Sequence, residues 1–110
     1  MTPEQRARTR ALNDQLRQHR TGGRIHFTPG VSEWGLDSLR ALLDEISRFD
    51  DFSPGNDPYG EHDFGALMFR ERQVFWKIDY LDAELQFGAP DPSDEAMCVR
   101  VLTVMLAEEY

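Results

Sequence analysis

The stretch NDPYGEHDFG contains three acids and a histidine within ten positions. Carboxylate oxygens and an imidazole nitrogen are donors that Mg, Mn or Zn can accept. Downstream, the segment FWKIDYL adds a lysine and an aspartate, and a lysine beside such acids can position an attacking water. These residues define a metal-dependent hydrolase as one hypothesis, with the candidate ligands Asp57, Glu61, His62, Asp63 and Asp79 and with Lys77 as the water-positioning residue.

The spacing of these residues also fits a purely structural role. It matches no HExxH, DxDxDG or CxxC pattern, and consecutive residues of an extended chain cannot all point the same way. Asp57 before Pro58 favours a turn, and Gly60 permits a positive φ. The structural hypothesis is that Asp63 accepts backbone N–H bonds and that His62 bridges to Asp79 or to a carbonyl, locking the loop on a sheet. A third interpretation is a loop that binds a partner or ligand.

Other kinds of chemistry find little support in the sequence. Cys98 follows a methionine in an apolar stretch, which predicts a buried, inert thiol and excludes an internal disulfide. Gly22-Gly23 is not followed by GK[ST], so no phosphate-binding loop is expected. No cofactor is expected apart from the alternative divalent metal. The first residues have no apolar core, and no apolar run approaches the roughly 20 residues of a membrane span; we therefore expect a cytoplasmic protein that does not enter a membrane.

Charge is distributed unevenly along the chain. Residues 1–24 carry six arginines against two acids, whereas the remainder carries six basic and eighteen acidic residues, for a net charge of −8. An acidic body repels nucleic acid, because affinity there comes largely from Lys and Arg replacing counterions, but it attracts a basic protein surface. We therefore expect a protein partner with a basic surface and no direct nucleic-acid contact, and a homodimer remains open. The predicted partner-binding residues are Asp50, Asp51, Asp57, Tyr59 and Glu61.

The secondary-structure pattern predicts one α+β domain over residues 1–110. Thr2, Pro3 and Gln5 form a helix start, and the helix is expected over 3–19, with its arginines Arg6, Arg10 and Arg17 on a solvated face. Leucines at helical spacing predict a second helix over 36–48. A third helix is predicted over 93–108, capped by Ser93 or Asp91. Alternating apolar residues predict an antiparallel sheet, with strands over 24–28, 64–70 and 73–81 and a long loop over 49–63.

Three sequence blocks carry a resemblance to a known group of proteins. NDPYGEHDFG, FWKIDYLD with its KIDY core, and GAPDPSDEAMCVRVLTVMLAEEY resemble, in this order, a family of small bacterial proteins catalogued as a domain of unknown function. The likeness covers residues 56–110 and is weaker upstream. It implies a group typical of alphaproteobacterial genomes, often on plasmids or in prophage-like regions, and brings no activity with it. It supports treating the following residues as one unit: Asp57, Tyr59, Gly60, Glu61, His62, Asp63, Lys77 and Asp79.

Together these features favour a binding protein over an enzyme. The expected function is that of a small acidic protein-binding module, for example a mobile-element anti-defence inhibitor (anti-CRISPR or anti-restriction) acting on a basic nucleic-acid-handling complex. The metal-dependent, nuclease-like hydrolase and a structural accessory or oligomerisation module are the alternatives.

Overall fold

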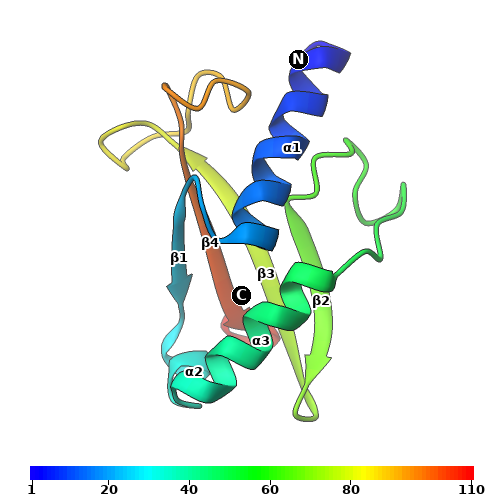
Figure 1. The fold of residues 1–110 in the computed structure, drawn as a ribbon, viewed down its shortest axis with the longest axis vertical. Helices are drawn as coiled ribbons and strands as arrows, with labels where there is room; N and C mark the ends of the chain where they lie inside the picture. Colours follow the sequence, from blue (N-terminus) through cyan, green and yellow to red (C-terminus); the bar gives the residue numbers. More distant parts are fainter.

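The computed structural model describes residues 1–110 and shows an α+β fold with three α-helices and one four-stranded sheet (Figure 1). The predicted fold class is thus confirmed, as are the first two predicted helices, and the three predicted strands agree to within two residues. The elements are α1 (Pro3–His19), β1 (Arg24–Phe27), α2 (Pro29–Ser32), α3 (Leu36–Arg48), β2 (Phe64–Phe69), β3 (Arg72–Leu81), β4 (Val99–Leu106) and a short 3-10 helix, η1 (Ala107–Glu109).

The helix predicted over 93–108 is wrong: this segment is a loop followed by β4 and η1. Arg100, Leu102, Val104 and Leu106 are buried on the face that meets the helices. Two of the three intervening residues, Val101 and Met105, are apolar too, so the sequence pattern of this segment fits the period of a helix as well as that of a strand. The β-branched residues in it favour the strand.

The sheet is mixed rather than purely antiparallel, with strand order β1-β4-β3-β2. The missed strand β4 lies in the middle, antiparallel to β3, and β1 pairs with it in parallel. The hairpin of β2 and β3 turns at Arg70 and Glu71, whose φ angles of 52° and 66° are both left-handed, as a two-residue type I′ turn requires. The predicted hairpin is therefore confirmed, with its turn one residue earlier than expected.

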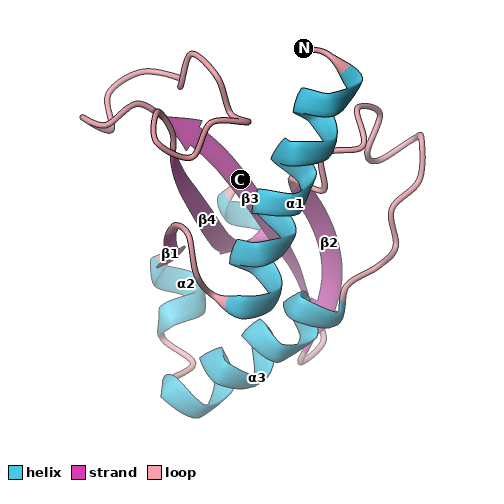
Figure 2. Ribbon diagram, turned by 45° about the horizontal axis from the view of Figure 1, so that its top comes forward, coloured by secondary structure: helices cyan, strands magenta, loops and turns pink.

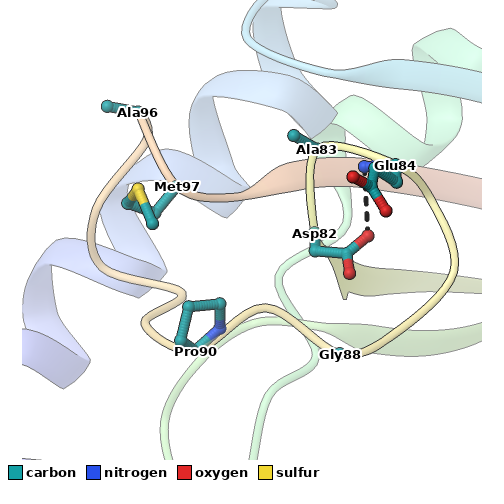
Figure 3. Close-up of a pocket in the computed structure, with 7 residues that line it drawn as sticks. All are labelled: Asp82, Ala83, Glu84, Gly88, Pro90, Ala96 and Met97. Carbon is teal, nitrogen blue, oxygen red and sulfur yellow. Dashed lines mark hydrogen bonds between the residues drawn. The ribbon is translucent and has the colours of Figure 1, made fainter.

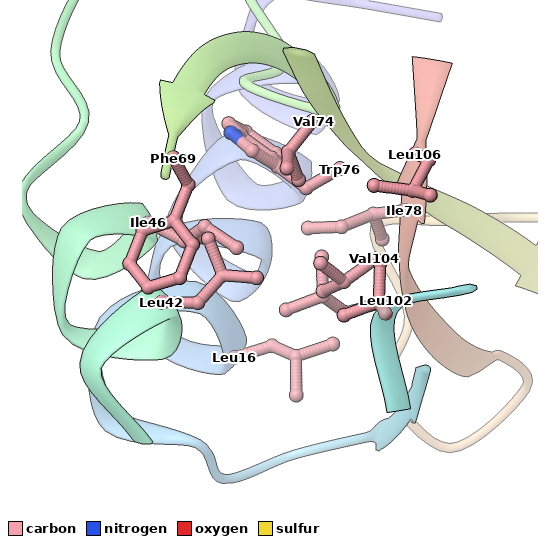
Figure 4. Packing of buried hydrophobic residues seen from close by; sticks show 11 residues of the cluster. Leu16, Leu42, Ile46, Phe69, Val74, Trp76, Ile78, Leu102, Val104 and Leu106 are labelled. Atoms are coloured by element: carbon pink, nitrogen blue, oxygen red, sulfur yellow. The ribbon is translucent and has the colours of Figure 1, made fainter. Parts of the chain in front are cut away.

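Helices α1 and α3 lie over the same face of the sheet (Figures 1 and 2). Between them and the strands lies the hydrophobic core (Figure 4). No helix combines the length and apolar composition that crossing a membrane would need. The core consists of Leu16, Val31, Leu42, Ile46, Phe69, Val74, Trp76, Ile78, Leu102, Val104 and Leu106.

Helix α1 begins as its sequence predicts but buries an unexpected face. The Thr2 hydroxyl accepts the N–H of Gln5 while the Gln5 side chain accepts the N–H of Thr2, a complete capping box. The buried side of α1 is largely polar: beside Leu12 and Leu16 it presents Thr9, Asn13 and Arg17. Such a face needs hydrogen-bond partners on the body, and these partners position the loop that the sequence singles out.

Candidate functional site

Three arginines of α1 hold the loop over residues 49–63. The guanidinium of Arg6 stacks over the Tyr59 ring at 4.8 Å, Arg10 Nη1 donates to the Gly60 carbonyl at 3.0 Å, and Arg17 reaches the Phe49 carbonyl at 2.9 Å. The predicted solvated face is therefore wrong, because these arginines recur along the side of the helix that contacts the loop.

Arg17 is the most deeply engaged of the three. Its side chain is 2% exposed and donates from Nη1 to the carbonyls of Ile46, Ser47 and Phe49, while Nη2 pairs with Asp14 at 2.9 Å. The three carbonyls lie at the C-terminal end of α3, where the helix dipole favours a cation. Backbone acceptors there generally lack intrahelical donors, although the Ile46 carbonyl also accepts the N–H of Phe49. Arg17 thus caps α3 from another helix.

His62 is fixed on α1 and not on the sheet. Its φ of 55° is left-handed, its ring stacks on Phe52 at 3.8 Å, and Nδ1 lies 2.9 Å from Asp14 Oδ1. The predicted bridge from His62 to Asp79 or to a carbonyl is wrong, because the imidazole contacts Asp14 of α1 instead. The sequence holds no local signal for this contact, since Asp14 is 48 residues upstream.

Asp57 is used within the loop itself. Its carboxylate accepts the backbone N–H of Glu61 at 3.1 Å and that of His62 at 3.3 Å, and Asp57 is only 9% exposed. The second ring nitrogen of His62, Nε2, lies 3.8 Å from Asp57 Oδ2. These bonds hold the turn that the Asp-Pro and glycine pattern predicts, and they leave little of Asp57 for a partner.

A buried polar network that is absent from the sequence-based predictions joins α1, the loop and the sheet. The Asn13 amide donates to Tyr80 Oη at 2.8 Å and to the Glu61 carbonyl at 3.0 Å, and it accepts from Arg100 Nε at 2.8 Å. Arg100 also donates to the Pro92 carbonyl and lies 3.5 Å from Cys98 Sγ. A signal existed in the sequence: Arg100 is the only charged residue within the apolar run AMCVRVLTVML.

Cys98 is buried, as predicted. Burial raises the pKa of its thiol, and the nearby Arg100 guanidinium only partly opposes this effect. A thiol with a raised pKa is a poor nucleophile at neutral pH.

The candidate metal ligands do not gather around one point. No group of three or more His, Cys, Asp or Glu side chains is arranged to hold a metal ion. Because Trp76 and Ile78 point into the core, strand alternation places Lys77 and Asp79 on the opposite face of the sheet, where they pair with each other at 2.9 Å. His62 contacts α1 on the helical side, so the proposed hydrolytic set is divided between two faces.

The five predicted partner-binding residues also separate. Asp50 and Asp51 are exposed at the start of the loop. Tyr59 is 62% exposed with Arg6 stacked on its ring. Glu61 is half-buried, and its carboxylate accepts from Tyr80 Oη at 3.3 Å; with Asp57 buried, no continuous acidic ridge forms here.

Two loop carboxyls have raised pKa values. Burial is the main cause for both Glu61 and Asp63, and each is further raised by neighbouring carboxylates. Burial likewise raises the pKa of the Tyr80 hydroxyl. The folded protein therefore holds protons on Glu61 and Asp63 more tightly than the unfolded chain does.

From this we predict that Asp63→Asn stabilises the protein most at pH 7. As pH falls through the raised pKa towards the ordinary value of 3.8, wild-type Asp63 becomes protonated in the folded state and its cost disappears. The gain of the variant over wild type should therefore shrink between pH 7 and pH 4. Urea unfolding at several pH values measures this, with Asp50→Asn at an exposed loop site as the control for loss of one charge. A gain that grows on acidification would contradict the prediction.

A second surface lies at the far end of the sheet, over residues 82–97. It carries five acids and no basic residue, and it exposes three large apolar side chains, Leu85 at 38%, Phe87 at 70% and Met97 at 53%. A pocket of about 390 Å³ opens between residues 82–88 and residues 90–97 of this surface (Figure 3). The pocket is lined by Asp82, Ala83, Glu84, Gly88, Pro90, Ala96 and Met97.

The acids of this surface are positioned by the turns that carry them. Asp82 Oδ1 accepts the backbone N–H of Glu84 and of Gln86, both at 3.1 Å, and Asp91 Oδ1 accepts from the N–H and hydroxyl of Ser93. These bonds lower the pKa of Asp91. Chemically, the pocket offers carboxylates beside a methionine and a proline, which suits the long side chain of a lysine or arginine.

Comparison with known proteins adds a family and nothing further. The profile of a family described as "Protein of unknown function (DUF3768)" matches residues 27–109. No curated protein and no solved structure matches the chain. Helix α1 and most of β1 precede the matched region, whereas the loop, the hairpin, the acidic surface and β4 fall within it. The chain therefore belongs to the DUF3768 family of proteins of unknown function.

Proposed function

We propose that this protein is a small acidic protein-binding module that contacts a basic partner through the surface over residues 82–97. The observation that supports this most is the combination, on one exposed segment, of apolar side chains, five acids of which only Glu95 is paired with a cation (Arg8, at 3.5 Å), and a pocket. Exposed apolar groups supply binding energy when water is removed from them. The acids select a basic partner and speed its approach.

The pocket indicates how such a partner binds. A lysine or arginine stem rests against Met97 and Pro90, and its charged head reaches Glu84 and the free oxygen of Asp82. Phe87, the most exposed of the three large apolar side chains of the segment, packs against an apolar residue next to that cation. This arrangement differs from the predicted contact at Asp50 to Glu61, where the acids are dispersed.

In its most concrete form, the proposed partner is a nucleic-acid-handling complex whose own binding groove is basic. The resemblance of the sequence blocks to proteins of alphaproteobacterial plasmids and prophage-like regions makes an anti-defence inhibitor, of the anti-CRISPR or anti-restriction kind, the natural example. An acidic protein can compete with nucleic acid for such a groove. The hydrolase alternative has less support, because its residues lie on two faces of the sheet.

The test compares two double variants that remove the same charge. Glu84→Gln with Asp94→Asn removes two of the five negative charges of the 82–97 surface, and Asp50→Asn with Asp51→Asn removes two of the four at the loop site predicted from sequence. Binding to purified CRISPR effector and restriction complexes, and to a fluorescent Lys/Arg-rich peptide, is measured by fluorescence anisotropy at 50 and 200 mM salt. We expect the first pair to weaken binding about tenfold or more and the second by less than about threefold.

Phe87→Ser separates the apolar contribution from charge. It is expected to weaken binding at both salt concentrations, because apolar burial is not screened. Equal losses for the two charge pairs would mean that only net charge matters. Binding that is indifferent to Glu84, Asp94 and Phe87 would reject the 82–97 surface as the contact site.

A further inference from the structure

Helices α1 and α3 both lie over one face of the sheet (Figure 2). The opposite face carries an apolar cluster that these two helices do not cover. Strand register places Ala66 beside Phe75 and Met105, and Met68 beside Gln73. The Phe64, Phe75 and Tyr110 rings contact one another, with centroids 5.3 to 6.4 Å apart. Met68 on the edge strand β2 is 62% exposed and Tyr110 is 76% exposed, so apolar groups meet solvent at the β2 side of this face and at the Tyr110 ring, whereas Met105 on the central strand β4 is only 3% exposed.

The charges on this face differ from those on the rest of the molecule. The register sets Arg24 in line with Val101 and Asp79, and His26 in line with Thr103 and Lys77. The face thus holds two permanent cations and one carboxylate, although the chain carries a net charge of −8. Two copies of an acidic protein repel each other at most approaches, but not here. Of the two exposed apolar surfaces, the 82–97 segment suits a basic partner, and the sheet face suits a copy of itself.

The Lys77–Asp79 pair makes the face self-complementary. The two side chains are neighbours on one face of β3, 2.9 Å apart, and both are more than a third exposed. A two-fold axis passing between them places Lys77 of each copy opposite Asp79 of the other. Met68 and the Tyr110 ring, which lies against Phe64 and Phe75, then pack against the second copy in a face-to-face arrangement of the two sheets.

We propose that the protein forms a two-fold homodimer through this face, independently of the partner bound at residues 82–97. Four strands about 4.8 Å apart and four rows of side chains give roughly 500 Å² per copy. Such an area lies at the lower limit for a specific interface. The dimer is therefore expected to dissociate on the order of micromolar concentration.

Sedimentation velocity and light scattering between about 1 and 200 µM measure the dimerisation of the full chain. Met68→Glu places a charge in the apolar cluster and should weaken the dimer at least about tenfold. Leu36→Glu is the matched control, because Leu36 is 63% exposed, close to the 62% of Met68, but begins α3. It should leave the dimer unchanged. Circular dichroism confirms that both variants fold.

A charge exchange gives a result that misfolding cannot imitate. Lys77→Glu alone and Asp79→Lys alone each set like charges against each other and should weaken homodimerisation at least about tenfold. Mixed in equal amounts, the two variants present opposite charges again and should form a heterodimer of nearly wild-type affinity. The proposal would be overturned if the wild-type protein stayed monomeric at 200 µM, or if the mixture of Lys77→Glu with Asp79→Lys stayed monomeric. In either case a different molecule, or solvent alone, would cover the face.

Discussion

Replacing Arg17 with alanine is expected to lower the free energy of unfolding by about 3 kcal/mol, because hydrogen bonds from a buried charged group contribute well above the ordinary value. The variant loses three bonds to carbonyls at the end of α3 and the ion pair with Asp14. It also leaves a cavity beside Phe52 and Trp76, whose rings the guanidinium contacts. For a domain of this size such a loss corresponds to a melting temperature roughly 15 °C lower.

Arg17→Lys tests whether the charge or the shape of the Arg17 side chain accounts for its contribution to stability. Lysine retains the cation near the α3 dipole but lacks the planar fork that reaches several acceptors at once. It should recover less than half of the loss. Arg40→Ala, at an exposed arginine of α3, is the control and should change stability by less than about 0.5 kcal/mol. Urea unfolding followed by tryptophan fluorescence measures the stability of the three variants. A loss below about 1 kcal/mol for Arg17→Ala would contradict the role of Arg17 as a cap of α3.

The contacts of Arg17 with the end of α3 depend on residues far from it in the sequence, and local patterns do not predict them. The helix boundaries of α1 follow from local chemistry, since Thr2, Pro3 and Gln5 form the cap wherever the helix lies. Which side of the helix is buried depends on what it meets, and the partners of Arg17 are about 30 residues away. The thin apolar content of α1 predicts a solvated surface, whereas the rest of the protein supplies hydrogen-bond acceptors for a buried polar face.

The loop over residues 49–63 and strand β4 likewise show that local sequence predicts local structure, whereas contacts between distant residues are not predicted. Proline, glycine and aspartate predicted the turn around Asp57 because they act on their own backbone. They carried no information about Asp14, which holds His62. In β4 the alternation of apolar and polar residues that predicts a strand is weak, because the strand is central and carries apolar residues on both faces. Met105, on the face away from the helices, is 3% exposed. Only an edge strand or a half-exposed strand shows clean alternation.

Gly65→Ala is the second substitution with a large expected effect, a loss of about 2–3 kcal/mol from overpacking. A Cβ at this position would lie 2.5 Å from Cε2 and 2.7 Å from Cζ2 of the Trp76 indole. Trp76 is fully buried, and Phe49 and Phe52 meet its ring edge-on at 5.5 and 6.2 Å, so the ring has no free space to move into. Urea unfolding measures the loss of stability, and the tryptophan emission maximum, to which Trp34 and Trp76 both contribute, reports the change around the indole. Gly55→Ala, whose Cβ would find Ser53 Oγ at 3.8 Å and no closer atom, is the neutral control.

Combining Gly65→Ala with Trp76→Phe identifies the cause of that loss. Phenylalanine removes the atoms with which the new methyl group collides, and it also removes the indole N–H, which has no acceptor in the folded protein. The double variant should therefore lose less unfolding free energy than the sum of the losses of the two single variants, by at least about 1 kcal/mol. Strict additivity would mean that strand propensity, and not the indole, requires the glycine. A glycine in the middle of a strand pattern is the sequence sign of such close approach, and the indole beside Gly65 is the group that uses it.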